Sequence, residues 1–191
     1  MIYHFQLINK EERKEIIAEL REVIQQAPWF IPKMKNGSKF NYRMSNCGKY
    51  GWISDRQGYR YVESNPYTGK PWPAIPDRVI AQIDYLKKEK IIPCLFKPES
   101  MLVNQYLAGE SLGIHQDKTE QNLTPPIISI SLGTPGIFLL GGLKGSQPIR
   151  EIVLNPGDVF IMSGNDRMRF HGFKSIICGT KRINLTIRQI Y

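Results

Sequence analysis

Apolar residues recur at every third or fourth position in residues 10–26, the spacing of one face of an α-helix. Asn9 lies directly before this segment and Glu12 follows three residues later, a pair typical of a capping box at a helix start. Pro28 is expected to stop the helix. The pattern therefore predicts one amphipathic helix with a buried stripe made of Ile16, Ile17, Leu20, Val23 and Ile24.

A second helix is predicted to begin at Pro76-Asp77, because proline costs no hydrogen bond at the first helical position. Pro93 closes this segment, and residues 87–90 form its solvated end. The apolar stripe of this helix consists of Val79, Ile80, Ile83 and Leu86.

The second half of the chain contains short β-rich runs separated by Gly, Pro and Asn, the residues of turns. These runs are residues 101–106, 127–132, 136–140, 149–154, 159–162 and 183–190. Short strands that follow helices predict an α+β fold, mainly β: an antiparallel barrel or a double-sheet jelly roll with helices outside. We found no repeat or linker, so the 191 residues are expected to form a single domain.

The last run has one apolar face and one polar face, since Ile183, Leu185 and Ile187 alternate with Arg182, Asn184, Thr186 and Arg188. Such a polar face normally lies in water. A second interpretation is that it lines a cavity, together with Asn104 and Tyr106, which share a face of another strand. A cavity with two guanidinium groups, an amide and a phenol suits a small dicarboxylate, because arginine binds a carboxylate through two parallel hydrogen bonds.

His115 and Asp117 are two residues apart, so in extended backbone both side chains lie on one face. Alone, a His-x-Asp pair usually has no function. With the distant His171 it gives two imidazoles and one carboxylate, the facial triad of non-haem Fe(II) oxygenases. Beside such an iron the expected dicarboxylate is 2-oxoglutarate, with O2 as the oxidant. A jelly-roll binding module in which these residues are only structural is the non-enzymatic alternative.

Residues 29–73 are rich in Gly, Pro, aromatic and basic residues and show little periodicity. Basic side chains neutralise phosphates and aromatic faces stack on exposed bases, so the segment is a candidate nucleic-acid surface. It could equally be an ordered extension whose aromatic residues pack on the core. The interleaved residues are Lys33, Lys35, Lys39, Arg43, Lys49, Arg56 and Arg60 with Phe40, Tyr42, Tyr50, Trp52, Tyr59 and Tyr61.

The formal charge of +9 also favours a polyanionic partner, although a basic surface can serve solubility alone. No apolar run is long enough for a membrane span, and the N-terminus lacks the pattern of a signal peptide. Cys47, Cys94 and Cys178 are expected to be free thiols in a reducing cytoplasm. Nothing in the sequence indicates more than a monomer, and His4 is expected to have no role.

A series of short motifs runs in a fixed order from residue 40 to residue 191 and resembles the AlkB family. That family comprises iron- and 2-oxoglutarate-dependent demethylases that repair alkylated nucleic acid. The motifs are MSNCG (44–48), GW (51–52), RQGY (56–59), KPWP (70–73), NQY (104–106), HQDK (115–118), the run 126–133, GGLK (141–144), FHG (170–172) and NLTIRQ (184–189).

The resemblance implies a double-stranded β-helix, or jelly roll, with a nucleotide-recognition lid at about residues 29–73 and a catalytic core at about residues 101–191. It implies His115, Asp117 and His171 as iron ligands. It implies that Trp52 stacks on a flipped base, and that Tyr59, Arg60 and Tyr61 contact the nucleotide. The implied 2-oxoglutarate contacts are Asn104, Tyr106, Arg182, Asn184 and Arg188, with Arg188 on the far carboxylate.

The expected activity is oxidative demethylation of 1-methyladenine and 3-methylcytosine in DNA, which releases formaldehyde, succinate and CO2. A 2-oxoglutarate oxygenase for a modified RNA or tRNA base is the alternative. Thr119 stands where the family commonly has an acidic residue that reads the base, and Gly145 replaces a basic residue, so base preference stays open. Met162 replaces an aromatic residue near the cavity, and the segment after His171 is shorter than in the best-known member.

Overall fold

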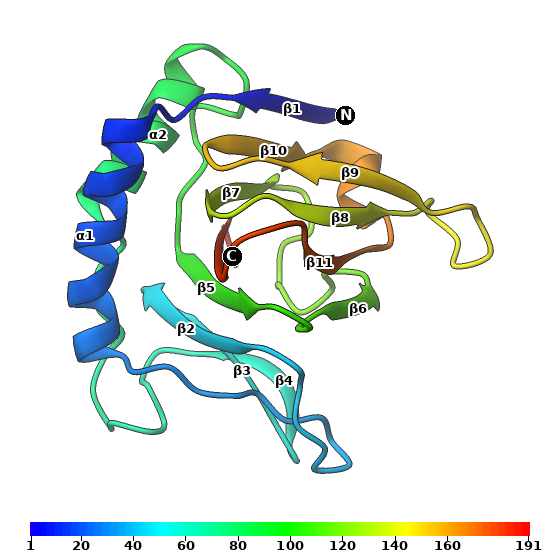
Figure 1. The fold of residues 1–191 in the computed structure, drawn as a ribbon. Helices are drawn as coiled ribbons and strands as arrows, with labels where there is room; N and C mark the ends of the chain where they lie inside the picture. Colours follow the sequence, from blue (N-terminus) through cyan, green and yellow to red (C-terminus); the bar gives the residue numbers. More distant parts are fainter.

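Two antiparallel β-sheets form the body of the protein in a computed structural model that describes residues 1–191 (Figure 1). The larger sheet has the order β1 (Ile2–Gln6), β10 (Asp158–Met162), β7 (Ile127–Gly133), β12 (Lys181–Arg188), β5 (Ser100–Leu107) and β2 (Arg43–Gly48). The smaller sheet has the order β6 (Leu112–His115), β11 (His171–Ile176), β8 (Gly136–Leu140) and β9 (Arg150–Leu154). The predicted mainly β jelly roll is confirmed.

Helices α1 (Lys10–Gln26) and α2 (Asp77–Lys88) lie together on the outer face of the larger sheet (Figure 1). The capping box is confirmed, since Asn9 accepts hydrogen bonds from the backbone amides of Glu11 and Glu12, and the Glu12 side chain accepts one from Asn9. The predicted stripes are buried at Ile16, Leu20, Val23, Val79, Ile83 and Leu86. Neither helix has the length and apolar content that crossing a bilayer requires.

The strict alternation of side chains gives the larger sheet two different faces. Leu185 and Ile187 of β12 are fully buried against the helices, together with apolar residues of β5, β7 and β10. The opposite face turns toward the smaller sheet and carries Arg182, Asn184, Thr186 and Arg188. The polar face of β12 therefore lines an internal cavity, as the second interpretation predicted.

Residues 29–73 contain more regular structure than their sequence indicates. β2 extends the larger sheet, and β3 (Gly51–Asp55) and β4 (Gly58–Val62) form a separate hairpin beside it (Figure 1). A Cβ atom on Gly51 would lie 2.2 Å from the ring of Trp72, so only glycine admits the buried indole here. The Trp72 indole in turn donates to the carbonyl of Val62, which fixes the base of the hairpin.

Candidate active site

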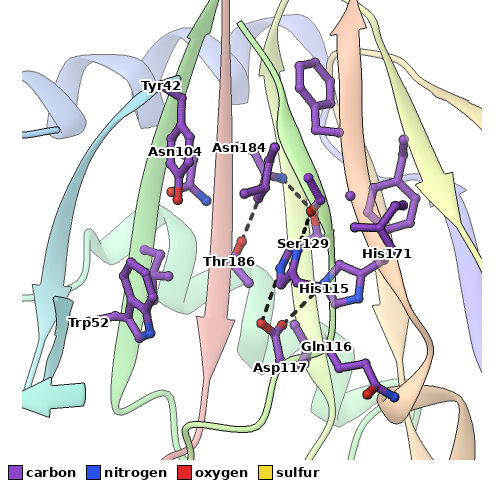
Figure 2. A pocket seen from close by; sticks show the side chains of 18 of the residues that line it. Tyr42, Trp52, Asn104, His115, Gln116, Asp117, Ser129, His171, Asn184 and Thr186 are labelled. Atoms are coloured by element: carbon purple, nitrogen blue, oxygen red, sulfur yellow. Dashed lines mark hydrogen bonds and ion pairs between the residues drawn. The ribbon is translucent and has the colours of Figure 1, made fainter. Parts of the chain in front are cut away.

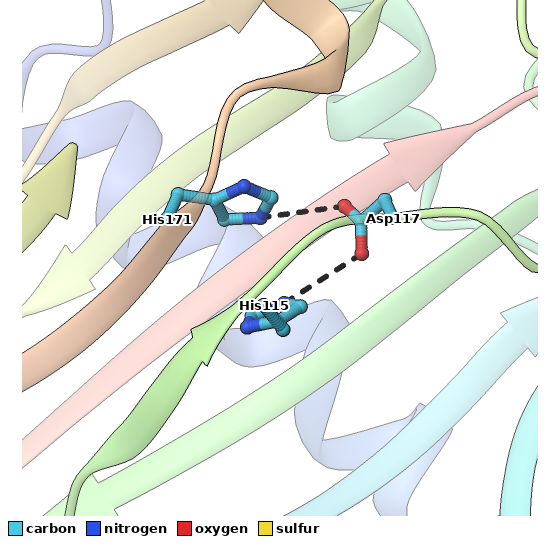
Figure 3. A group of neighbouring side chains, drawn as sticks. All are labelled: His115, Asp117 and His171. Carbon is cyan, nitrogen blue, oxygen red and sulfur yellow. Dashed lines mark ion pairs between the residues drawn. The ribbon is translucent and has the colours of Figure 1, made fainter. Parts of the chain in front are cut away.

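Three candidate metal ligands meet between the two sheets (Figure 3). The ligand atoms of His115, Asp117 and His171 all lie within 4.8 Å of one another. Nε2 of His115 is 3.6 Å from one oxygen of Asp117, and Nε2 of His171 is 3.5 Å from the other. Asp117 and His171 are buried, whereas 34% of the His115 side chain remains exposed. The group therefore has one accessible side, as an iron site with open positions requires.

Strand pairing sets the position of both imidazoles. His171 lies directly opposite His115 in the antiparallel pair of β11 and β6, and their ring centroids are 4.5 Å apart. A Cβ atom on the next residue, Gly172, would lie 2.7 Å from the carbonyl oxygen of Leu112. Glycine at this position therefore permits the close approach of β6 and β11 that brings the histidines together.

Each imidazole is oriented through its other nitrogen. Nδ1 of His115 lies 2.8 Å from the carbonyl oxygen of Gly113, and Nδ1 of His171 lies 3.0 Å from that of Arg169. A carbonyl can only accept, so both Nδ1 atoms carry a proton, and Nε2 is the nitrogen of each ring that is available to bind a metal. Burial, followed by the charge of His171, lowers the pKa of His115 and favours its neutral form. This is the state in which imidazole binds a metal.

Asp117 is held as an anion by its neighbours. Burial alone would raise its pKa, but Arg188 and the two imidazoles lower it well below its usual range. Arg188 contributes most to this, since its Nη2 donates to Asp117 Oδ2 at 2.8 Å. The donor set is thus two imidazole nitrogens and one carboxylate, which fits Fe(II).

A cavity of about 380 Å³ extends from these ligands between the sheets (Figure 2). Each residue predicted to contact 2-oxoglutarate lines it, namely Asn104, Tyr106, Arg182, Asn184 and Arg188. Asn184 donates to Ser129 Oγ at 2.6 Å and accepts from Thr186, so its amide is fixed (Figure 2). Asn104 Oδ1 and Arg188 Nε are buried without a partner. A bound carboxylate would satisfy the Arg188 donor, so these residues fit the co-substrate.

The contacts of Arg188 do not support its expected placement on the far carboxylate of 2-oxoglutarate. Its guanidinium contacts Asp117 and is therefore beside the metal ligands. Arg182 lies at the other end of the polar face of β12, over the ring of Phe173, and donates to Ser131 and to the carbonyl of Leu154. Burial lowers the pKa of Arg182 to about 10, which leaves it cationic at neutral pH. Its position suits the carboxylate that points away from the metal.

The substrate candidates fall into two groups. Trp52, Tyr59 and Thr119 line the same cavity as the triad, and the rings of Trp52 and Tyr59 stack with centroids 5.6 Å apart. Asn46 holds Trp52 in place by bonding both its backbone amide and its carbonyl. Arg60 and Tyr61 do not line the cavity: Arg60 pairs with Asp55.

Tyr61 does not line the cavity, and its hydroxyl contacts Glu120 and Arg188. Of the other departures from the family pattern, Met162 lines the cavity, whereas Gly145 packs near Phe170 outside it. No pattern in the sequence indicated that Arg167 would lie close to the triad, where it donates to the backbone carbonyl of Asp117. Arg167 lies in the 3-10 helix Gly164–Met168, and its side chain is 1% exposed.

Comparison with known proteins agrees with this geometry. A family model described as the 2OG-Fe(II) oxygenase superfamily matches residues 1–188. The chain is 37% identical over 182 residues to the alpha-ketoglutarate-dependent dioxygenase AlkB of Escherichia coli (strain K12), a match that covers 92% of this chain and 84% of that protein. It is 28% identical over 174 residues to the nucleic acid dioxygenase ALKBH1 of Homo sapiens, covering 89% of this chain and 42% of the relative. The solved structure of OsALKBH1 superposes with a TM-score of 0.80 at 25% identity, covering 98% of this chain and 97% of that one.

The jelly roll, the His-Asp-His group and the family match define an Fe(II)- and 2-oxoglutarate-dependent dioxygenase, which uses O2 as oxidant. Within this class the chain belongs to the AlkB family, since its similarity to bacterial AlkB extends over nearly its whole length.

Proposed function

We propose that this enzyme removes alkyl groups from N-alkylated bases in DNA, with 1-methyladenine and 3-methylcytosine as substrates. The observation that carries the proposal is that Trp52 and Tyr59 line the same cavity as the candidate metal ligands. A base stacked on these rings would lie in the one space that also holds the oxidising centre. Exposed lysines and arginines around the hairpin supply positive charge that would neutralise a phosphate backbone. They include Lys33, Lys35, Lys39 and Arg56.

In this proposal His115, Asp117 and His171 hold Fe(II), and residues 101–191 form the catalytic core. Fe(II) with 2-oxoglutarate and O2 supplies the oxidation, which converts 2-oxoglutarate to succinate and CO2 and releases the methyl carbon as formaldehyde. Arg182 binds the far carboxylate of 2-oxoglutarate, while Asn104, Tyr106 and Asn184 fix its orientation. Arg188 keeps Asp117 anionic and offers its free Nε to the near end of the co-substrate.

Residues 29–73 act as the nucleotide-recognition lid in this proposal, with Trp52 as the stacking platform. The cavity lies between two sheets, so a target base must leave its duplex or be single-stranded already. Leaving the stack costs least for a lesion that cannot pair, which favours bases alkylated on the Watson–Crick edge. Thr119 lies on the cavity wall and is our candidate for reading the base edge.

We also propose that the enzyme works as a monomer in the cytoplasm. The three cysteines form no disulfide, and two of them, Cys94 and Cys178, are exposed thiols. Free exposed thiols are characteristic of a reducing compartment.

A single-turnover assay tests the function. The protein is incubated with Fe(II), ascorbate, 2-oxoglutarate and a short single-stranded oligonucleotide that carries one 1-methyladenine, and mass spectrometry follows loss of one methylene unit. Loss that requires 2-oxoglutarate supports the proposal. An RNA oligonucleotide with the same lesion is the comparison substrate. A faster reaction with RNA would mean that the enzyme acts on a modified RNA or tRNA base and not on DNA. Decarboxylation of 2-oxoglutarate without any demethylation would refute the substrate and keep the enzyme class.

A further inference from the structure

A buried cluster of charged side chains adjoins the candidate ligand Asp117, and two of its members, Glu120 and Arg167, do not line the cavity. Glu120 is at its centre, with a side chain that is 0% exposed. Its oxygen Oε1 accepts from Arg188 Nη1 at 2.7 Å, and its oxygen Oε2 pairs with Arg167 Nη2 at 3.2 Å. Two arginines from different parts of the chain are thus held by one carboxylate.

Both arginines also donate hydrogen bonds to Asp117, each to a different group of that residue. Arg188 donates to the Asp117 carboxylate at 2.8 Å, and Arg167 donates to the Asp117 backbone carbonyl at 2.9 Å. Arg167 comes from the 3-10 helix that precedes His171, so it also links the chain segments that carry two of the ligands. Fixing a residue at both its backbone and its carboxylate leaves little freedom to rotate the ligand oxygen.

The β3–β4 hairpin joins the same cluster through one hydroxyl. Tyr61 donates to Glu120 Oε1 at 2.9 Å and accepts from Arg188 Nη1 at 2.9 Å. In the hairpin Tyr61 lies directly opposite Trp52, the proposed stacking residue. Two contacts, Tyr61 with Arg188 and Arg188 with Asp117, therefore connect the hairpin that would bind the base to a candidate metal ligand.

We propose that Glu120 is a positioning residue that sets the orientation of Asp117 through Arg167 and Arg188, and that Tyr61 couples the hairpin to this orientation. A buried ion network adds little to the stability of the fold, because the charges lose their hydration and well-packed apolar residues often stabilise as much. Here the charges converge on a single candidate ligand. Partners of this kind typically change metal affinity by about 10- to 100-fold when they are removed.

The test measures metal binding without nucleic acid, so it is independent of the substrate. Mn(II) is titrated into the full-length protein, and the EPR signal of the free ion gives the dissociation constant. Glu120→Gln keeps the size of the side chain but removes its charge, and we expect it to weaken Mn(II) binding by about tenfold or more. Glu151→Gln is the matched control, since it breaks the exposed ion pair with Lys174 outside the hairpin and should leave Mn(II) affinity unchanged.

Tyr61→Phe removes only a hydroxyl from the same cluster. It therefore tests whether the cluster affects metal binding even if Glu120→Gln does not fold. This hydroxyl makes two hydrogen bonds in the cluster, and we expect its loss to weaken Mn(II) binding by about two- to tenfold. Tyr50→Phe, a buried tyrosine outside the cluster, is its control. Hydrogen exchange supplies the second measurement: Mn(II) should slow exchange in residues 51–62 of the wild type and slow it less in Tyr61→Phe.

Wild-type affinity in a folded Glu120→Gln protein would overturn the role of Glu120. Unchanged affinity and unchanged hairpin exchange in Tyr61→Phe would overturn the coupling. Because the inference rests on the proposed metal site, a wild-type protein that binds no Mn(II) would overturn both together, whereas failure to demethylate DNA would leave the inference standing.

Discussion

Arg182 and Arg188 project into one cavity from the same face of β12, but they serve its two opposite ends. They are six residues apart, a separation of about 20 Å along an extended strand. Arg188 contacts the candidate ligand Asp117, whereas Arg182 packs on Phe173 and bonds the backbone around residues 134 and 154. A dicarboxylate bound between them would meet a metal at one end and a guanidinium at the other.

Substitution of Arg182 by lysine should weaken 2-oxoglutarate binding. Lysine keeps the charge but cannot bind a carboxylate through two parallel hydrogen bonds. Loss of one charge-assisted hydrogen bond corresponds to a KM for 2-oxoglutarate that is raised by about 10- to 100-fold. Steady-state decarboxylation measures this KM. Arg150→Lys, at an exposed position of β9, is the control. An unchanged KM would show that Arg182 does not contact the co-substrate.

Removal of the Trp52 indole should affect the nucleic-acid substrate and not the co-substrate. Stacking of one base on an aromatic ring is worth about 1–3 kcal/mol, so Trp52→Ala should lower kcat/KM for the oligonucleotide by about 5- to 150-fold. The affinity for 2-oxoglutarate, measured in the same protein, should stay at the wild-type value. Tyr85→Ala, at an exposed aromatic residue of α2 outside the lid, is the control. The reverse pattern would mean that the lid has been assigned to the wrong residues.

The three cysteines should differ sharply in reactivity. Cys47 is 0% exposed, and burial raises the pKa of its thiol, so it has almost no thiolate at neutral pH. Cys94 and Cys178 are exposed. Native protein treated with iodoacetamide should therefore gain two labels by mass spectrometry, and the third should appear only in denaturant. Rapid alkylation of Cys47 in native protein would indicate that β2 opens readily from the larger sheet.

Sequence patterns predicted much of this fold because burial imposes periodicity. The alternation of Ile183, Leu185 and Ile187 with polar neighbours determines which side of β12 faces the helices, and spacing determines the buried stripes of α1 and α2. β1 was not predicted because it is an edge strand with partly exposed residues on both faces. The β3–β4 hairpin was missed because its aromatic residues occur on both strands without a clear apolar face.

The site was predicted in its residue types but not in its arrangement. The alternation of residues predicted that Arg182 and Arg188 lie on one face of β12. It could not predict which of the two arginines lies beside Asp117, because that depends on the path of the chain after β6. The position of Tyr61 was missed for a similar reason, because its partner Glu120 is 59 residues away. A buried arginine such as Arg167 leaves no periodic signal at all, since arginine in a sequence normally indicates an exposed position.

Metal should stabilise the folded protein, and His171 should be required for this effect. A ligand that binds only the folded state adds about 2.7 kcal/mol at a concentration 100 times its dissociation constant. For a domain of this size that corresponds to a rise in Tm of about 5–10 °C. His171→Gln removes one of the three candidate ligands and should abolish most of the rise, as should EDTA with the wild type. The matched control is His4→Gln, because His4 pairs with Asp158 outside the cavity and should leave the rise intact. Differential scanning calorimetry with and without Mn(II) measures all of these samples. An equal rise in His171→Gln and the wild type would mean that the metal binds elsewhere, since a single site built on three residues cannot lose one of them without losing affinity.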